Sequence, residues 1–514
     1  MVIDGRSVPS GHVVDTDVCI VGAGAAGITL AKEFINAPFR VCVLESGGFE
    51  YDAATQSLYA GDTAGQPYFP LDVCRLRYFG GTTNHWSGFC RPLDDLDFQV
   101  RDWVPHSGWP FPKSELIPYY ERAQAVCELG PFAYEYADWE PQAQRIGLDE
   151  SCLKARFFQS SPPTRFGRAY RDALERAPNI SLYIHTNALE IQTDATARVA
   201  TGIGAGTLAG NRYLVRAKQY IIALGGIENA RLLLLSNRVQ QAGLCNEYDL
   251  VGRYFMDHPI LRTGSVLLPG DTRLAGFSRR KMYGTTELAP FITANETIMR
   301  EKRLLNFGVR LKKPILPPSM NSLRILSKTL RKGRWPDGFT EHIGNIVTDL
   351  DTIAASAVHR LRDLKLLDIL YWMEPAPNPN SRITLTHDKD RLGLNRVRLD
   401  WQLTELDLHT MREAHKLLAM ECGVQGIGRV KVGFDEASSA WPSHLSGSYH
   451  HMGTTRMHVD PKHGVVTPNC QTHQVQNLFI AGSSVFPTAG HANPTLTIVT
   501  LAIRLADHIK RIMA

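Results

Sequence analysis

The sequence has little that would tie the chain to a membrane or to nucleic acid. Across its 514 residues no stretch approaches about 18 uninterrupted apolar residues, so we expect no membrane-spanning helix. Residues 1–17 lack the apolar segment of a signal peptide, and the default expectation is a cytoplasmic protein. The net charge is only +5 and no segment carries a long basic run, which argues against nucleic acid as the main partner.

Paired cysteine motifs are also missing. The 9 cysteines are scattered, odd in number and never spaced as Cys-x-x-Cys. Cys19 and Cys42 fall inside apolar, strand-like runs. These features indicate buried free thiols in a reducing compartment.

Glycine is abundant, with 42 residues, and one glycine-rich segment near the start has the arrangement of a dinucleotide fold. A β-branched run at residues 17–21 stops at Gly22-Ala-Gly-Ala-Ala-Gly27 and is followed by helix-forming residues 28–36. A second apolar run, residues 40–44, ends in Glu45. This order of strand, turn, helix, strand and acid predicts a bound dinucleotide, although the motif alone does not separate FAD from NAD.

Each residue singled out in this segment has a physical role in the prediction. Gly22 permits the tight turn, Gly24 lets the backbone approach a pyrophosphate, and Gly27 lets the helix pack closely on the sheet. The start of the helix offers unpaired N–H groups and partial positive charge to the phosphates. Glu45 is placed to accept hydrogen bonds from a ribose diol. The N-terminal candidate binding residues are Gly22, Gly24, Ala26, Gly27, Glu45 and Ser46.

Two later segments show the same passage from a strand through glycine to a helix. One is residues 219–231, and the other runs from a strand at 477–481 through Gly482 to an apolar helix at 496–509. Because the three turns lie far apart in the sequence, we expect one nucleotide domain assembled from separated segments. The candidates for contacts to the ribityl chain and ring of a flavin are Gly225, Gly482, Ser483, Asn493, Pro494 and Thr495.

These motifs resemble those of the glucose–methanol–choline (GMC) oxidoreductases, from about residue 15 to the end of the chain. That family's landmarks come in the expected order, at residues 21–27 with Glu45, 79–88, 223–234, 251–259, 377–385, 449–457 and 481–495. The resemblance implies an α/β FAD-binding Rossmann-like domain and an α+β substrate domain built on an antiparallel sheet. The expected boundaries are 1–265 with 441–514 for the FAD-binding domain and 266–440 for the substrate-binding domain.

The resemblance also implies a reaction and the residues that perform it. Transfer of a hydride from an alcohol carbon to flavin N5 requires a base for the hydroxyl proton, and histidine has a suitable pKa. In YHHMGTTRM the family's catalytic histidine aligns with His450, and the residue that orients the hydroxyl aligns with Asn493. His451 and His491 are the rivals for the base. The implied substrate is a sugar or glycoside alcohol, with a non-sugar alcohol as the alternative, and the electrons pass to oxygen or another acceptor.

A glycine-rich loop at residues 79–88 is expected to pass close to the flavin ring. Its candidate cofactor contacts are Gly81, Thr82, Asn84 and His85. In some members of the family a histidine in this loop is covalently linked to FAD, whereas other members bind FAD without a bond. The sequence places a nucleophilic residue in the right loop and leaves both states open for His85.

Residues 266–440 lack glycine-rich nucleotide turns and are expected to hold most of the substrate domain. Patterns of period two predict strands at 382–386 and 396–401, after a turn at 377–381. Helical patterns occupy 403–422, which starts with Thr-x-x-Asp, and also 321–334 and 354–372.

The stretch from Met299 to Arg334 is rich in basic residues. Together with the helical segments it has three functional interpretations: a substrate lid, a docking patch for an electron acceptor, or a membrane-surface contact. An ordinary solvated helix face is the more frequent explanation of such a pattern.

A metal site and three other functions are the alternatives to flavin-dependent oxidation. His458 and His463 have the spacing of a zinc-ligand pair, but Asp460, Pro461 and Gly464 indicate a turn, and we predict no metal. The other functions are a non-redox flavin lyase of the same fold, a flavin-binding partner without catalysis, and an NAD-linked dehydrogenase. The last is disfavoured because the C-terminal motifs have no place in it.

Overall fold

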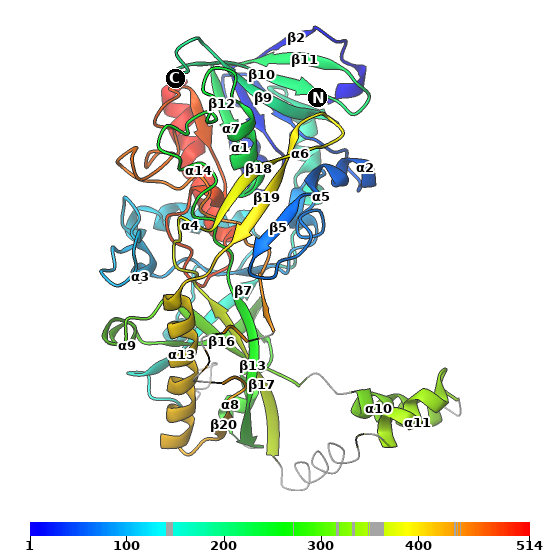
Figure 1. The fold of residues 1–514 in the computed structure, drawn as a ribbon, viewed down its shortest axis with the longest axis vertical. Helices are drawn as coiled ribbons and strands as arrows, with labels where there is room; N and C mark the ends of the chain where they lie inside the picture. Colours follow the sequence, from blue (N-terminus) through cyan, green and yellow to red (C-terminus); the bar gives the residue numbers. More distant parts are fainter. Residues whose placement is uncertain are drawn as a thin grey trace.

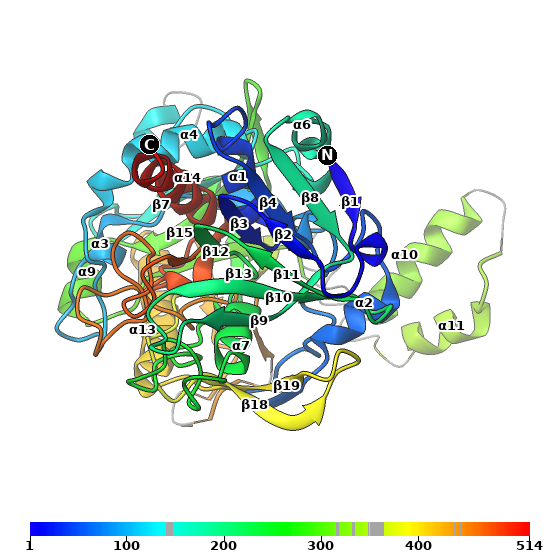
Figure 2. The same cartoon turned by 90° about the horizontal axis from the view of Figure 1, so that it is seen from above.

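The structure is a computed structural model, which describes residues 1–139, 147–270, 272–314, 318–331, 335–347, 349, 364–435, 438, 440–442 and 444–514. Two bodies, each built on β-sheets, lie one above the other along the long axis of the molecule (Figure 1). Both chain termini belong to the upper body in that view, and a long antiparallel sheet organises the lower body. A pair of helices projects sideways from the lower body (Figures 1 and 2).

A six-stranded parallel sheet organises the upper body. In spatial order its strands are β1 (Val2–Asp4), β8 (Ile180–Ile184), β4 (Val41–Leu44), β3 (Val18–Val21), β12 (Gln219–Ile222) and β22 (Leu478–Ile480). Every residue of β3 and β4 is buried, as expected for continuous apolar runs in a sheet covered on both faces. Because β12 pairs with both β3 and β22, the predicted assembly from separated segments is confirmed. Cys19 and Cys42 face each other in register there as buried free thiols, as expected.

Three helices follow three strands of this sheet. They are α1 (Ala25–Glu33) after β3, α7 (Glu228–Leu235) after β12 and α14 (Thr495–Ile512) after β22. α14 packs against both α1 and α4 (Ile117–Val126). Since the carboxyl ends of parallel strands lie at one edge, the glycine turns that lead into these helices meet there.

Two smaller sheets and several short helices complete this part of the chain. One sheet joins β2 (Val13–Asp15), β11 (Arg212–Arg216), β10 (Ala200–Gly206) and β9 (Asn187–Thr193). The other joins β18 (Arg382–Lys389), β19 (Asn395–Trp401) and β5 (Asp62–Gly65), which confirms the strands predicted after residue 381. The short helices are α2 (Ala53–Gln56), α3 (Asp95–Phe98), α5 (Phe166–Ala169) and α6 (Arg171–Arg176).

The lower body is built on a nine-stranded antiparallel sheet, as the resemblance implied. Its main path runs through β20 (Arg429–Lys431), β13 (Ile260–Pro269), β17 (Leu364–Met373), β16 (Phe307–Lys312), β15 (Thr286–Ala294), β7 (Leu153–Ser160) and β6 (Phe89–Cys90). β14 (Lys281–Tyr283) and β21 (Leu445–Ser446) pair at its sides, and α8 (Arg273–Gly276) and α9 (Glu296–Glu301) lie in its connections.

The two faces of this sheet have different neighbours. α13 (Glu405–Val424) packs on the face that carries Ile292 and Val309. Its start is the predicted Thr-x-x-Asp capping box, formed by Thr404 and Asp407. Because successive strand residues alternate between faces, Gly308 points the other way, and the position of a β-carbon on Gly308 would lie 2.9 Å from a ring carbon of His491. The second face therefore abuts the segment that precedes α14.

The boundary between the two predicted domains crosses these sheets. β6 and β7 lie before residue 266 in the sequence, yet they pair within the nine-stranded sheet. The predicted domain boundaries at residues 265 and 441 therefore stay a prediction.

One predicted helix is wrong. Residues 354–372 were expected to be helical, but the described part of that stretch belongs to β17, and residues 354–363 lie outside the described residues. β17 alternates between more and less buried positions over its last residues, which is the period of a strand. An apolar run of this length does not distinguish the two structures until its sheet partners, β13 and β16, are known.

The helix predicted within 321–334 is present as α10 (Pro318–Leu330), and residues 332–334 lie outside the described residues. α10 packs against α11 (Phe339–Val347) to form the projecting pair of helices. The described basic residues between 299 and 334 do not form one patch. Arg300 and Lys302 are paired with Glu296 and Glu413, whereas Arg310 is buried in β16.

No helix in the described ranges is both long and apolar enough to cross a membrane.

Candidate functional site

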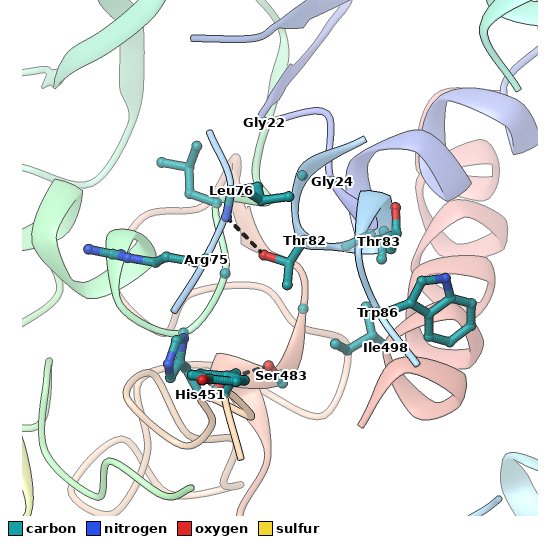
Figure 3. Close-up of a pocket in the computed structure, with 18 of the residues that line it drawn as sticks. Gly22, Gly24, Arg75, Leu76, Thr82, Thr83, Trp86, His451, Ser483 and Ile498 are labelled. Carbon is teal, nitrogen blue, oxygen red and sulfur yellow. Dashed lines mark hydrogen bonds between the residues drawn. The ribbon is translucent and has the colours of Figure 1, made fainter. Parts of the chain in front are cut away.

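A cavity of about 460 Å³ lies where the glycine turns of the parallel sheet meet. Its walls come from the turns after β3, β12 and β22, from residues 75–87, and from the segments at 448–451 and 493–498. In Figure 3 the turn with Gly22 and Gly24 lies across the cavity from His451 and Ser483. Segments from both ends of the sequence thus line one elongated space.

Most of the residues predicted from the sequence lie in this wall. They are Gly22, Gly24, Ala26, Glu45, Ser46, Gly81, Thr82, His85, Gly225, His450, Gly482, Ser483, Asn493, Pro494 and Thr495. Two predicted contacts, Gly27 and Asn84, do not line it. A β-carbon on Gly27 would lie 1.8 Å from the carbonyl oxygen of Gly22, so Gly27 serves helix packing. The amide nitrogen of Asn84 donates to the carbonyl oxygen of Phe79 at 2.8 Å and braces the loop.

The glycines of the wall divide into those that permit packing and those that leave space. Gly22 has φ = 104°, and a β-carbon there would lie 2.7 Å from the carbonyl oxygen of Ala223. At Gly24, Gly225 and Gly482 a β-carbon would meet nothing within 4 Å. These three positions open on the cavity at successive turns of the sheet. The space they leave is suited to an extended dinucleotide, whose phosphates would approach the start of α1.

Glu45 lies at the end of β4 with its carboxylate inside the wall. One carboxylate oxygen accepts from the backbone N–H of Ala23 and the other from that of Gly47, both at 3.0 Å. Burial raises the pKa of Glu45, and the two backbone hydrogen bonds oppose that rise. A carboxylate has about four lone-pair sites, so acceptor capacity remains for the two hydroxyls of a ribose.

His85 stands in the loop after Gly81 and lines the cavity. Partial burial and the positive charge of Arg165 both lower the pKa of His85, which favours its neutral form. Its backbone N–H donates to the carbonyl oxygen of Thr82, and this turn presents the ring to the cavity.

At the other end of the cavity, His450 forms the centre of a buried group of side chains. Its Nε2 lies 3.3 Å from the amide nitrogen of Asn493, the partner predicted from the sequence. Its Nδ1 lies 2.8 Å from Nδ1 of His258 and 2.9 Å from the hydroxyl of Ser448. Burial lowers the pKa of His450 to about 3, and that of His258 also to about 3, so both rings are neutral at physiological pH.

These contacts determine which nitrogen of His450 carries the proton. Nε2 of His258 faces the carbonyl oxygen of Gly490 at 2.9 Å and must donate to it, so Nδ1 of His258 is an acceptor. The hydroxyl of Ser448 donates to the Asp257 carboxylate at 2.6 Å and is therefore also an acceptor toward His450. Two acceptors thus hold the proton on Nδ1 of His450. Nε2 keeps its lone pair beside Asn493, as a base requires.

Asp257 anchors this arrangement, and the sequence did not single it out. Its carboxylate accepts from the Tyr68 hydroxyl at 2.5 Å and from the backbone N–H groups of Ser448, Tyr449 and His450 at 3.0, 3.1 and 2.9 Å. Tyr449 has φ = 65°, a left-handed conformation that these hydrogen bonds stabilise. The only sequence signal for Asp257 and His258 is their position in the motif at 251–259.

The two rival histidines have different surroundings. His451 also lines the cavity, but in the described structure its Nε2 is buried with no hydrogen-bond partner. His491 is buried outside the cavity wall, and neither ring nitrogen has a hydrogen-bond partner among the described residues. Of the three, His450 combines a defined tautomer with a polar neighbour at Nε2.

The buried histidines make stability depend on pH. Burial lowers the pKa of His258, His450 and His491 to about 3 and that of His415 and His451 to about 4. The unfolded chain binds these protons near pH 6.5 and the folded chain does not. The stability contribution of these histidines is therefore fully present above about pH 6.5, and each histidine lowers stability by about 1.4 kcal/mol per pH unit as the pH falls from there toward its folded-state pKa. Asp97 and Asp407, with pKa values raised to about 8 and about 6, oppose this loss in part.

We expect the midpoint of thermal unfolding to fall steeply between pH 6 and about pH 4, because five groups outweigh two. Differential scanning calorimetry in buffers of constant ionic strength measures this directly. A midpoint that stays constant from pH 7 to pH 5 would contradict the assigned burial of neutral histidines.

Comparison with known proteins places the chain among oxidoreductases. Residues 377–502 match the family model described as GMC oxidoreductase. A 2-methyl-1,2-propanediol dehydrogenase of Mycolicibacterium austroafricanum is 25% identical over 96% of this chain and 95% of its own length. The large subunit of fructose dehydrogenase from Gluconobacter japonicus is 24% identical over 97% of this chain and 98% of its own. A C-glycoside 3-oxidase of Arthrobacter globiformis is 36% identical over 23% of this chain and 22% of its own.

Solved structures share the fold over nearly the whole chain. A formate oxidase superposes with a TM-score of 0.57 at 16% identity, covering 98% of this chain and 99% of its own. A pyridoxine 4-oxidase of Mesorbium loti gives a TM-score of 0.55 at 15% identity, covering 96% of this chain and 98% of its own. The predicted fold class, a Rossmann-like domain with a second domain on an antiparallel sheet, is confirmed.

Proposed function

We propose that the chain is a GMC oxidoreductase, an FAD-dependent enzyme that oxidises an alcohol to a carbonyl. The alcohol group is proposed to belong to a sugar or glycoside, in keeping with the relatives named for fructose and C-glycosides. One observation carries the proposal. The cavity that opens at Gly24 also reaches a neutral histidine, His450, whose Nε2 is an acceptor and lies 3.3 Å from the Asn493 amide nitrogen.

The residues present are suited to FAD. The open positions at Gly24, Gly225 and Gly482 accommodate its length, and the start of α1 supplies N–H groups for the pyrophosphate. Glu45 would accept from the ribose hydroxyls, and Ser483, Pro494 and Thr495 line the same cavity as His450. When bound, FAD supplies the acceptor for the hydride, at N5 of its ring.

Side chains of the protein accept the proton of the substrate hydroxyl. Nε2 of His450 accepts the hydroxyl proton of the substrate, and the Asn493 amide donates to the hydroxyl oxygen and fixes its orientation. The imidazolium that forms keeps its Nδ1–H on the acceptors His258 and Ser448. Ser448 in turn donates to the Asp257 carboxylate, whose negative charge favours the protonated ring.

His258 is proposed as a positioning residue for His450. His258→Phe keeps the ring volume and removes the acceptor at 2.8 Å, leaving Ser448 as the remaining acceptor for Nδ1. We expect kcat for flavin reduction to fall roughly 10-fold, the value of a hydrogen bond of about 1.4 kcal/mol, with a smaller change in KM. His258→Gln keeps an acceptor oxygen and should restore part of the rate. Stopped-flow measurements over a range of pH test this, since a merely structural role would leave the pH dependence unmoved.

Anaerobic mixing with a panel of alcohols and sugars tests the function itself. An alcohol oxidase or dehydrogenase bleaches the flavin absorption band, whereas a non-redox lyase or a flavin-binding partner leaves the band intact. Repeating the assay with oxygen and with an artificial dye identifies the electron acceptor. A holoenzyme whose flavin no alcohol reduces would contradict the proposal.

Acid precipitation of the holoenzyme tests whether His85 is covalently linked to FAD. If the yellow colour stays in the pellet when the protein is precipitated with acid, the cofactor is covalently bound, and His85→Ala should release it. If the colour passes into the supernatant, His85 is a non-covalent neighbour of the cofactor.

A further inference from the structure

Arg310 is a buried cation with no counter-charge among the described residues. It lies in β16 with 5% of its surface exposed, and among the described residues it makes neither an ion pair nor a side-chain hydrogen bond. Its guanidinium stands over the rings of Phe89 and Phe291, 4.9 and 5.2 Å from their centres. A buried charge is costly unless an opposite charge or several hydrogen bonds offset the loss of water. The ring faces offset only part of this cost.

The surroundings of Arg310 add positive charge. Lys312 lies two residues further along β16, on the same face of the sheet, and likewise has no partner in the described part of the chain. The nearby carboxylates are already engaged, because Glu287 pairs with Arg280 and Asp368 pairs with Arg262. Burial, followed by repulsion from neighbouring arginines, lowers the pKa of Lys312 to about 8 and that of Arg310 to about 10.

This cluster adjoins the site that holds His450. On one side, Phe89 follows Trp86 and Ser87, which line the cavity. On the other side, Gly308 shares the sheet face of Arg310 and abuts His491, two residues before Asn493. Arg310 therefore lies behind the cavity lining, close to Phe89 at the end of the loop at 85–89 and on the sheet face that abuts His491.

We propose that Arg310, assisted by Lys312, binds an oxyanion, a carboxylate or a phosphate, carried by the alcohol substrate. This inference rests on the proposed alcohol oxidation and narrows its substrate to an acidic sugar derivative or hydroxy acid. A guanidinium presents paired donors that match the geometry of an oxyanion. Binding supplies the counter-charge that the described side chains do not provide, and it fixes the orientation of the reacting hydroxyl.

The test compares matched substrates with and without the charge. Sorbitol is paired with gluconate, methyl glucoside with methyl glucuronide, and glucose with glucose 6-phosphate in anaerobic flavin reduction. We expect the charged member of at least one pair to have a kcat/KM at least roughly 10-fold higher in the wild-type holoenzyme. Arg310→Met should lower kcat/KM for that charged substrate by roughly 10- to 100-fold and change the neutral one by less than about threefold.

Two further variants control for charge and for folding. Lys313→Met, like Arg310→Met, removes one positive charge, but from an exposed side chain just beyond β16. It should leave the preference for the charged substrate intact. Arg310→Lys keeps the charge without the paired donors and should retain an intermediate preference. FAD content and the unfolding midpoint identify any variant that fails to fold.

A binding measurement separates this inference from the proposed function. Malonate, with malonamide as its neutral match, is titrated into the holoenzyme and the change in the flavin spectrum is recorded. Saturable binding of malonate that Arg310→Met abolishes supports the oxyanion site, even if no alcohol reduces the flavin. Equal oxidation of charged and neutral substrates by wild type and Arg310→Met would overturn the inference and leave the proposed function standing. Absence of malonate binding to the wild type would also contradict the proposed oxyanion site.

Discussion

Replacing His450 with alanine should lower the rate constant for flavin reduction by roughly 10²- to 10⁴-fold, the range for loss of a general base. The cofactor should remain bound, because the turn at Gly24, which is the proposed place for its pyrophosphate, lies across the cavity from the segment at 448–451. The expected loss of rate is large because the two acceptors at Nδ1 keep the ring proton there. Nε2 of His450 is therefore unprotonated and can accept the proton of the reacting hydroxyl. Single-turnover reduction under anaerobic conditions measures the chemical step without reoxidation.

Two companion variants make this result specific. His463→Ala removes an exposed histidine from the same C-terminal region and should reduce the flavin at the wild-type rate. His451→Ala tests the neighbouring rival, whose Nε2 has no hydrogen-bond partner in the described structure. If His451→Ala loses the fast reduction and His450→Ala keeps it, the base is misassigned by one residue. The hydride chemistry would survive that correction.

The sequence predicted the cofactor half of the molecule well because its signals are local. Each turn from strand through glycine to helix is contained in a short segment, and its position in one sheet follows from the rules for parallel strands. The turns at Gly24, Gly225 and Gly482 open on the same cavity for that reason. The pairing of His450 with Asn493, in contrast, came only from the resemblance to a family.

Sequence reasoning missed the groups that act through contacts between distant segments. His258 touches His450 across 192 positions, and no local pattern sets their nitrogens 2.8 Å apart. Arg310 was placed in a basic stretch that suggested a surface, because charge composition does not reveal which face of a strand a residue occupies. The register of β16 with β15 and β17 buries Arg310 within the sheet instead.

The wrong prediction of a helix at 354–372 also arose because contacts between distant segments are not visible in the sequence. The residues of β17 are apolar enough for either structure, and only pairing with β13 and β16 makes the strand the more stable choice. Tertiary contacts thus override a local preference, as they do for many short apolar runs.

The turn after β3 permits a test that separates cofactor binding from folding. Gly24 has φ = −88°, which any residue adopts, and a β-carbon there meets nothing within 4 Å. Gly24→Val should therefore fold normally while its side chain occupies the space reserved for the pyrophosphate. We expect FAD affinity to fall by at least roughly 100-fold, which corresponds to about 2.7 kcal/mol. The purified variant should be colourless, with an unfolding midpoint close to that of the wild-type apoprotein.

Gly27→Val and Gly423→Val are the matched controls for this substitution. A β-carbon on Gly27 collides with the backbone of Gly22 at 1.8 Å, so that variant should lose stability rather than FAD alone. Gly423 lies in α13 with open space around it and away from the cavity, and its variant should be yellow and stable. If Gly24→Val binds FAD as the wild type does, the cofactor does not approach the backbone at that turn. The assignment of Gly24 would then fail, because the open space at this glycine is the structural reason for placing the pyrophosphate there.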